Sequence, residues 1–347
     1  MATITIDYGS NSDVELVLPA NIATTPLDLE VPPNFTYGNT KVRVKEFRLR
    51  ASSEKLMSSS SYFRAMFDGI RFREAQDLKE HGFAAVQLLD PEDDPSAMQI
   101  ILGILYSSDV QVPDDIDLQT LYDIAKLVDK YFWHESVAPR AVSWFERLQG
   151  SQGLPDSFDE TLFMWMWIAW VFEIQDSFKK LSRLAQQCAT KSIDPADKKI
   201  LLPYMVIDAI NNQREAGFQI IEKKFVAFKK ALIEDNGTEA DKSLEYVMLR
   251  SLVLGHATFL ARDLKLGDFA ATDHFGSSIR MVTSLIKSVR YTKGVWVDAR
   301  NCGHGQFTMS EGGRWDFKCA LEKVVESLKM DDWGIELTDF KPLSGTK

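Results

Sequence analysis

The chain has 347 residues, of which 45 % are hydrophobic and 26 % are charged, so it can bury a core and is not a wholly disordered chain. Its formal net charge of −10 argues against general binding to the phosphates of nucleic acids. The three cysteines, Cys188, Cys302 and Cys319, are too widely spaced for a disulfide framework, and they favour a reducing compartment, the cytoplasm or the nucleus.

Neither a signal peptide nor a membrane span is expected. The first residues lack the basic start and apolar run of a signal peptide. The most apolar stretch, "LFMWMWIAWVF" at 162–172, is shorter than the roughly 20 residues that cross a bilayer. We therefore expect 162–172 to be a buried helix.

The N-terminal part predicts strands joined by a long loop. Residues 13–18 alternate in hydrophobicity, which predicts a strand with one well-buried face. Prolines and a glycine make 19–40 a long loop, and 44–50 is predicted as a second strand although its alternation is imperfect. The stretch "SSEKLMSSSSYFRAMFDG", residues 52–69, follows, and its four serines leave three readings open: a soft linker, a phosphorylation patch or a helical corner.

A third strand at 84–90 precedes three predicted helices. Asp94 is placed to cap the first helix, with Pro95 at its first position, where the missing N–H costs nothing. Asp117 is the expected cap of the second helix. In the third, at 135–150, Pro139 is expected in the first turn, because deeper inside a helix it would remove a hydrogen bond and clash. Gly150 and Gly153 are expected to end that helix.

The stretch 149–157, "QGSQGLPDS", is the best domain boundary. Beyond it, Ser157 and Glu160 fit a capping box, followed by one helical run that is apolar nearly all round and then amphipathic to Cys188. Two further helices are predicted, at 202–235, ended by Asn236-Gly237, and at 244–262. The tail from residue 294 is irregular and glycine-rich, and it precedes a last helix at 319–330.

Several motifs in order resemble the BTB/POZ domain, in the form found in many fungal proteins. They are the opening D-V-x-L at Asp13, the corner "FRLRASSEKLMSSSSYFRAMFDG", the D-D-P-x-A cap at Asp93 and "LQTLYDIAKLVDKY" at 118–131. The resemblance covers about Asp13 to Leu148. It implies an α+β fold, with a BTB/POZ domain at 1–150 and a mostly α-helical region of unknown role at 151–347. Extended loops at 19–40 and 69–83 depart from the family pattern.

The resemblance also bears on the serine stretch, since the family has two short helices meeting at a turn there. Ser60 or Ser61 would then cap the N–H groups ahead of Phe63, and Leu56 would face inward with Phe63. One continuous helix with two inward serines is the alternative, although serine is a mediocre residue inside a helix. Phosphorylation of Ser58 to Ser61 has no support beyond the hydroxyls.

The search for catalytic or metal-binding patterns is negative, so we expect no catalytic residue, no cofactor and no metal. Cys302, His304 and Cys319 lack the second close pair of ligands that zinc prefers. No G-x-S-x-G, phosphate loop or dinucleotide fingerprint occurs. The alternative from a different functional class is an enzyme whose site lies in 157–347. Such an enzyme would need a pocket that includes His256, His274 or His304.

The family likeness implies a non-enzymatic module that binds proteins, and we expect a homodimerising scaffold or regulatory protein. Its self-association surface would include Val14, Leu16 and Met57. The alternative is a substrate adaptor of a cullin-type ubiquitin ligase, whose contact turn would hold Tyr106 and Asp109; the glutamate common in cullin-binding members is missing. We expect no nucleic acid and no membrane among the partners.

Overall fold

The structure is a computed structural model. It describes residues 2–9, 11–19, 44–107, 112–194, 196–197, 200–234, 244–264, 276–288, 295–297, 305–307 and 317–342. The chain divides into two compact units. Unit 1 is Met1–Leu154 with Trp167–Ile174, and unit 2 is Pro155–Met166 with Gln175–Lys347. The expected loop at 19–40 lies almost wholly outside the described residues.

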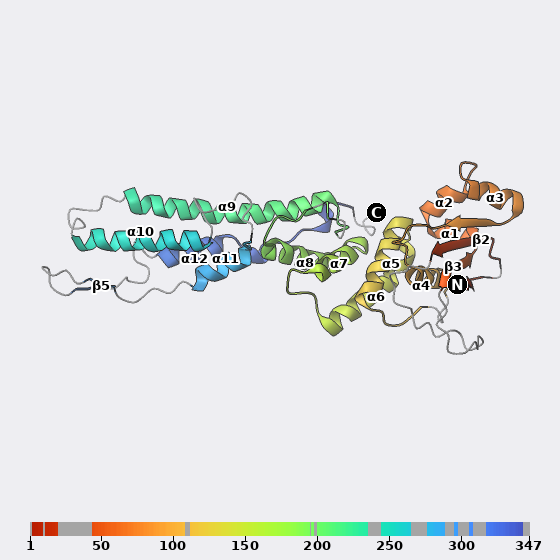
Figure 1. Ribbon diagram of the computed structural model, residues 1–347, viewed down its shortest axis with the longest axis horizontal. Helices are drawn as coiled ribbons and strands as arrows, with labels where there is room; N and C mark the ends of the chain where they lie inside the picture. The colour runs from red at the N-terminus through yellow and green to blue at the C-terminus, as the bar shows by residue number, and fades with distance from the viewer. Residues whose placement is uncertain are drawn as a thin grey trace. The chain divides into compact units, whose positions relative to one another are not determined.

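Unit 1 contains a four-stranded sheet in the order β1-β3-β2-β4 (Figure 1). Its strands are β1 (Ala2–Asp7), β2 (Val14–Pro19), β3 (Val44–Ala51) and β4 (Ala84–Gln87). β3 pairs parallel with β1 and antiparallel with β2, and β4 pairs parallel with β2. The three expected strands are present. β1 was missed, although Thr and Ile alternate through it.

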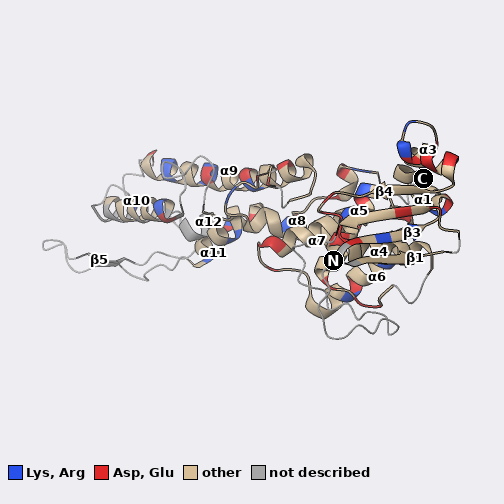
Figure 2. Ribbon diagram, turned by 45° about the vertical axis from the view of Figure 1, so that its right-hand side comes forward, with Lys and Arg blue, Asp and Glu red and all other residues tan. Residues whose placement is uncertain are grey.

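β2 is buried on both faces, whereas the sequence predicted one buried face. It lies between β3 and β4, and all its residues from Val14 to Leu18 are buried. Glu15 is only 4 % exposed because Arg48 and Arg50 of β3 bind its two carboxylate oxygens at 3.0 and 3.1 Å. Figure 2 shows acidic and basic residues on neighbouring strands of this sheet. An interior charge on a strand is therefore matched by arginines on the next strand.

The described residues of the N-terminal part of unit 1 also form six helices. They are α1 (Ser53–Ser59), α2 (Ser61–Phe67), α3 (Arg73–His81), α4 (Pro95–Leu105), α5 (Leu118–Tyr131) and α6 (His134–Gln152). The predicted caps are confirmed: Asp94 accepts from the backbone N–H of Ala97 at 2.8 Å, and Asp117 from that of Thr120 at 2.7 Å.

The expectations for 69–83 and for the course of α6 were partly wrong. The stretch 69–83 is not an extended loop, because α3 occupies 73–81 and ends at Gly82 in the left-handed conformation. Pro139 lies inside α6, not in its first turn, since the buried Trp133 already starts this helix by accepting from the N–H of Val137 at 3.1 Å. Pro139 is exposed, so the carbonyl that loses its partner can be solvated. Gly153 ends the helix, while Gly150 lies within it.

α7 (Glu160–Val171) has residues in both units, because unit 1 takes the residues from Trp167. The capping box was wrong: Asp159 caps α7, accepting from the N–H groups of Thr161 and Leu162 at 2.9 and 3.3 Å. The apolar run is not one helix either, since it breaks at Glu173, whose φ is +58°, before α8 (Gln175–Cys188). The three tryptophans of α7 are buried, as expected.

The other elements of unit 2 are α9 (Tyr204–Glu234), α10 (Leu244–Leu264), α11 (Ile279–Ser288), β5 (Val295–Val297), β6 (Gly305–Phe307), α12 (Phe317–Ser327) and two 3-10 turns, Met330–Asp332 and Leu337–Asp339. Figure 1 shows α9 and α10 side by side. Their apolar stripes share a core with α11, α12 and Trp333. Among the described helices none is long and apolar enough to span a membrane.

Candidate protein-interaction surface

The start of α1 is fixed by residues from distant parts of unit 1. Asp13 accepts from the backbone N–H of Ser53 at 2.6 Å and from its hydroxyl at 2.7 Å. The hydroxyl oxygen of Tyr106 accepts from the N–H of Ser52 at 2.6 Å. These bonds satisfy free N–H groups in the first turn, and they hold α1 in a defined position on the sheet.

Ser60 forms the corner between α1 and α2. Its φ and ψ of −141° and 124° interrupt the helix, and its Oγ accepts from the N–H of Phe63 at 3.1 Å. The same hydroxyl donates to the backbone oxygen of Tyr131 at 2.6 Å. The expected pair of short helices is confirmed, and the single continuous helix is wrong. Leu56 and Phe63 are both fully buried, as predicted.

An aromatic cluster packs behind this corner. The Phe63 ring lies 5.6 Å from the ring of Tyr131 and 5.4 Å from that of Trp133, and all three side chains are buried. Tyr131 donates its hydroxyl to Asp93 at 2.6 Å, and burial together with this bond raises its pKa. The corner is therefore anchored to α5 by both packing and hydrogen bonds.

Lys130 ties the end of α5 to the loop before α4. Its Nζ lies 2.8 Å from Asp90 and 2.7 Å from the buried Asp93. The hydrogen bond from Lys130 lowers the pKa of Asp90. Burial alone would lower the pKa of Lys130, but its bonds to the two carboxylates outweigh this and raise it. Lys130 and Asp90 therefore stay charged around neutral pH, and their ion pair joins the end of α5 to this loop.

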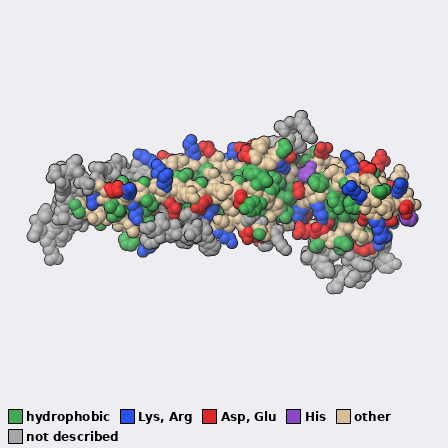
Figure 3. All heavy atoms as spheres, turned by 90° about the horizontal axis from the view of Figure 1, so that it is seen from above, with side chains coloured by type: hydrophobic (Ala, Val, Ile, Leu, Met, Phe, Trp, Pro, Cys, Tyr) green, Lys and Arg blue, Asp and Glu red, His purple; other side chains and the backbone are tan. Residues whose placement is uncertain are grey.

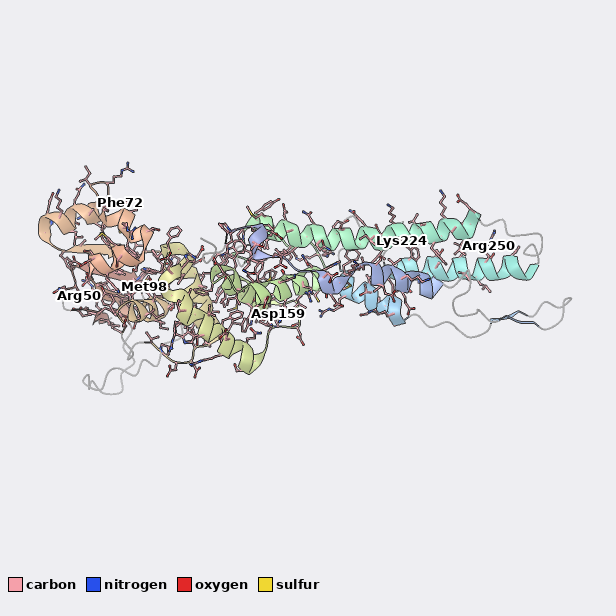
Figure 4. All side chains as sticks on the ribbon, turned by 180° about the vertical axis from the view of Figure 1, so that it is seen from behind. Arg50, Phe72, Met98, Asp159, Lys224 and Arg250 are labelled. Carbon is pink, nitrogen blue, oxygen red and sulfur yellow. The ribbon has the colours of Figure 1, made fainter. Side chains whose placement is uncertain are left out.

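Large apolar side chains are nevertheless exposed on unit 1. They are Tyr62, Ile70, Phe72, Phe83, Leu89 and Phe132. Figure 3 shows hydrophobic side chains on the face of this unit that carries α1 to α3, and Figure 4 labels Phe72 at the same end. Ile70, Phe72 and Phe83 flank α3, which itself buries only Ala75. Large exposed apolar side chains are a feature of protein-contact surfaces.

Phe132 is the most unusual of these residues. It ends α5 in the left-handed conformation with φ of +57°, and its side chain is 55 % exposed. A bulky residue is strained there, and exposure of the ring gains nothing for the fold. In the sequence, Phe132 lies in the run of bulky residues "KYFWHE" at 130–135.

The three residues predicted for self-association separate into two groups. Val14 and Leu16 are fully buried in β2, so they form no surface, and that prediction was wrong. Alternation marks which side of a strand is apolar, but not which strand is interior. Met57 is partly exposed on α1, next to the buried Leu56, so its role stays a prediction.

The turn predicted for a cullin contact begins with a side chain that is already engaged. The Tyr106 ring packs 5.9 Å from the ring of Tyr8, and burial raises the pKa of its hydroxyl. Asp109 lies outside the described residues. Asp114, a few residues further along the chain, is bound by α6. Trp144 and Arg147 donate to its backbone oxygen at 3.0 and 2.8 Å.

The described residues contain no group of three or more His, Cys, Asp or Glu side chains that could hold a metal ion. Cys302, His304 and His274 lie outside the described residues, as do the side chains of Cys319 and His256. The expectations about a metal or a histidine-lined pocket therefore remain predictions.

Residues 36–136 match the family model of the BTB/POZ domain. The chain contains a BTB/POZ domain. The match includes β3, β4, α1 to α5 and the corner at Ser60, whereas β1 and β2 precede it and most of α6 follows it. BTB/POZ domains are protein–protein interaction modules, and this one is followed by a mostly helical region. No curated protein and no solved structure matches the chain.

Proposed function

We propose that the chain is a self-associating scaffold or regulatory protein whose contact module is its BTB/POZ domain. The observation that carries this proposal is the exposure of Ile70, Phe72 and Phe83 around α3, at 73, 46 and 39 %. α3 contributes one buried residue to the core, so folding alone gives little reason for this apolar segment. Exposed apolar groups of this size are suited to burial against a second copy.

Glycines lie at both ends of the segment. Gly69 and Gly82 have φ of +141° and +69°, which residues with a side chain rarely adopt. They allow the chain to turn where it leaves α2 and where it enters β4.

The test is the solution mass of the full chain by multi-angle light scattering at tens of micromolar. We expect a dimer for the wild type and a monomer for the double variant Ile70→Ser, Phe72→Ser, with an unchanged circular dichroism spectrum. Leu285→Ser is the matched control, because Leu285 is similarly exposed but lies in unit 2. A monomeric wild type, or a double variant that stays dimeric, contradicts the proposal.

The second candidate is an adaptor that brings substrates to a cullin-type ubiquitin ligase. The observation that favours it is Phe132, an exposed and strained aromatic residue on unit 1. Phe132→Gly removes the ring and relieves the strain, so it should keep or raise the melting temperature. A purified cullin N-terminal domain should then bind the wild type, and bind this variant at least tenfold more weakly. No binding by the wild type rules the adaptor role out.

A further inference from the structure

α8 buries two different stripes of side chains. One is apolar and includes Phe178, Leu181 and Ala185. The other is polar, with spacings of three and four residues that place it on one face: Lys179, Ser182, Arg183, Gln186 and Gln187. A polar stripe on an amphipathic helix normally faces water. Here Ser182, Gln186 and Gln187 are buried, so something covers this face.

The covering element is the C-terminal segment 330–337, which we call the strap. The polar stripe binds its backbone: Gln187 donates to the oxygen of Met330 at 2.7 Å, Arg183 donates to the oxygen of Trp333 at 2.7 Å, Gln186 accepts from the N–H of Gly334 at 3.0 Å, and Ser182 accepts from the N–H of Ile335 at 2.8 Å. An ion pair joins Lys179 to Glu336. The strap therefore runs antiparallel to α8, and its backbone is bound as a peptide would be.

The side chains of the strap add selectivity. Trp333, Ile335 and Leu337 alternate along it and are all buried, as in an extended peptide with anchors at every second position. A Cβ on Gly334 would lie 2.5 Å from the backbone oxygen of Lys179. A Cβ on Gly217 of α9 would lie 2.8 Å from the ring of Trp333. The site thus selects the pattern Trp-Gly-apolar-Glu-apolar.

Lys329 is the backbone link between α12 and the strap, and the buried Trp333 of the strap also shares the core of unit 2. Leu328 is buried with α12, and Lys329 follows it in the left-handed conformation with φ of +46°. A long side chain in that conformation is strained, so rotation at Lys329 relieves the strain while it redirects the strap and leaves α12 in place.

We propose that the polar stripe of α8 is a peptide-binding site for this Trp-Gly-apolar-Glu-apolar pattern, occupied in cis by the strap and open to the strap of a second copy. The bonds that hold the strap are to its backbone, its glycine and its own anchors. A second copy presents the same groups, so it satisfies the site equally well once Lys329 rotates. All residues involved belong to unit 2, so this contact is separate from the one proposed for the BTB/POZ domain.

The test uses the wild-type full chain, mixed as equal amounts of unlabelled and ¹⁵N-labelled protein and incubated at 37 °C. A carbodiimide then joins Lys179 to Glu336 covalently, and mass spectrometry reports whether the two halves carry the same isotope. Lys130 and Asp90 form a matched control within unit 1, because they are a direct ion pair in one folded unit.

Exchange of straps predicts that Lys179–Glu336 products with one labelled and one unlabelled half increase with incubation time. Lys130–Asp90 products should stay unmixed. A Lys179–Glu336 product that stays as unmixed as the control overturns the proposal, whatever the result for self-association of the BTB/POZ domain. Mixed products that appear at once and equally for both pairs would reflect random collision, and they overturn it as well.

Discussion

The helix caps of unit 1 and the strap contacts of unit 2 use polar side chains at very different distances along the chain. In unit 1, Asp94, Asp117 and Ser60 each cap a helix by accepting from an N–H group three residues ahead. In unit 2, Ser182 accepts from an N–H group 153 residues away, and Gln186 from one 148 residues away. Both partners of a helix-cap bond lie within a short stretch of sequence. The bonds between α8 and the strap form only after the chain has folded back on itself.

Because of this difference, each unit should lose stability through a different contact. Unit 1 depends on a corner where one serine joins local capping to a long-range bond with Tyr131. Unit 2 depends on a strap that must reach α8 from the end of the chain. Each can be disturbed by a single substitution, and a matched control exists for each.

The largest effect is expected for Gly334→Ala. The new Cβ meets the backbone of Lys179, and the positive φ of +119° disfavours any side chain, so we expect a loss of about 3 kcal/mol in the stability of unit 2. Urea unfolding followed by tryptophan fluorescence measures it. Gly150→Ala is the control: it lies in α6 with open space around it, and alanine there should stabilise by about 0.5–1 kcal/mol. Equal effects of the two changes would refute the importance of the strap.

Ser60→Ala is expected to cost about 2 kcal/mol, because the variant loses the cap of α2 and leaves the oxygen of Tyr131 without this donor. Thermal melting with circular dichroism provides the measurement. Ser61→Ala, one residue on and exposed, should change stability by less than about 0.5 kcal/mol. A loss at Ser61 as large as that at Ser60 would argue against Ser60 as the organising residue.

Lys130→Ala is expected to cost about 1–2 kcal/mol, discounted because Lys130 is partly exposed. The pKa of Asp90 is lowered from 3.8, so its contribution is present above that value and is lost as the pH falls through the lowered pKa. The pKa of Lys130 is raised from 10.5, so its contribution is lost as the pH rises through the raised value.

The difference in melting temperature between Lys130→Ala and the wild type should therefore shrink at both extremes of pH. Arg73→Ala, which breaks an ion pair between the exposed Arg73 and the partly exposed Asp77, should show almost no difference at any pH. A difference for Lys130→Ala that is the same at acidic, neutral and alkaline pH would contradict the assigned ion pairs.

The smallest effect on folding is expected for Met57→Glu, since Met57 is already partly exposed. If α1 contributes to the contact between copies, this change places like charges across a two-fold axis, and the dimer should dissociate while the protomer stays folded. Light scattering and circular dichroism together separate the outcomes. An unfolded variant would show instead that Met57 belongs to the core.

The same distinction between local and long-range bonds determines which features could be predicted from the sequence. The caps at Asp94 and Asp117 and the helix pair around Ser60 were predictable, because side chain and backbone N–H lie within one turn. The BTB/POZ match at 36–136 supports the motif-based reading of that region. The presence of β1 was also readable from its Thr-Ile alternation, and we missed it.

Other features depend on tertiary contacts that no local pattern contains. Val14 and Leu16 look like one face of an edge strand until β4 is placed beside β2. Pro139 was expected at a helix start because nothing in the sequence shows that Trp133 fixes an earlier one. The polar stripe of α8 looks solvent-facing until Trp333 and Gly334 cover it.

The exposed residues of the interaction surface were only partly predictable. Met57 was named for the self-association surface, and it is partly exposed. Ile70, Phe72 and Phe83 were not named, because the stretch around them was read as an extended loop. The signals for α3 were the run of polar residues after Phe72 and the glycine at Gly82, which ends the helix.

Hydrogen exchange of the Gly334→Ala variant, read by mass spectrometry, tests the contrast between the units most directly. The account predicts that amides of α8 and of 330–340 exchange at least about tenfold faster than in the wild type, while those of α1, α2 and α5 keep their protection. Faster exchange throughout both units would contradict it, because the strap would then support the whole chain. Unchanged exchange in α8 would contradict it as well, since the strap would not hold that helix.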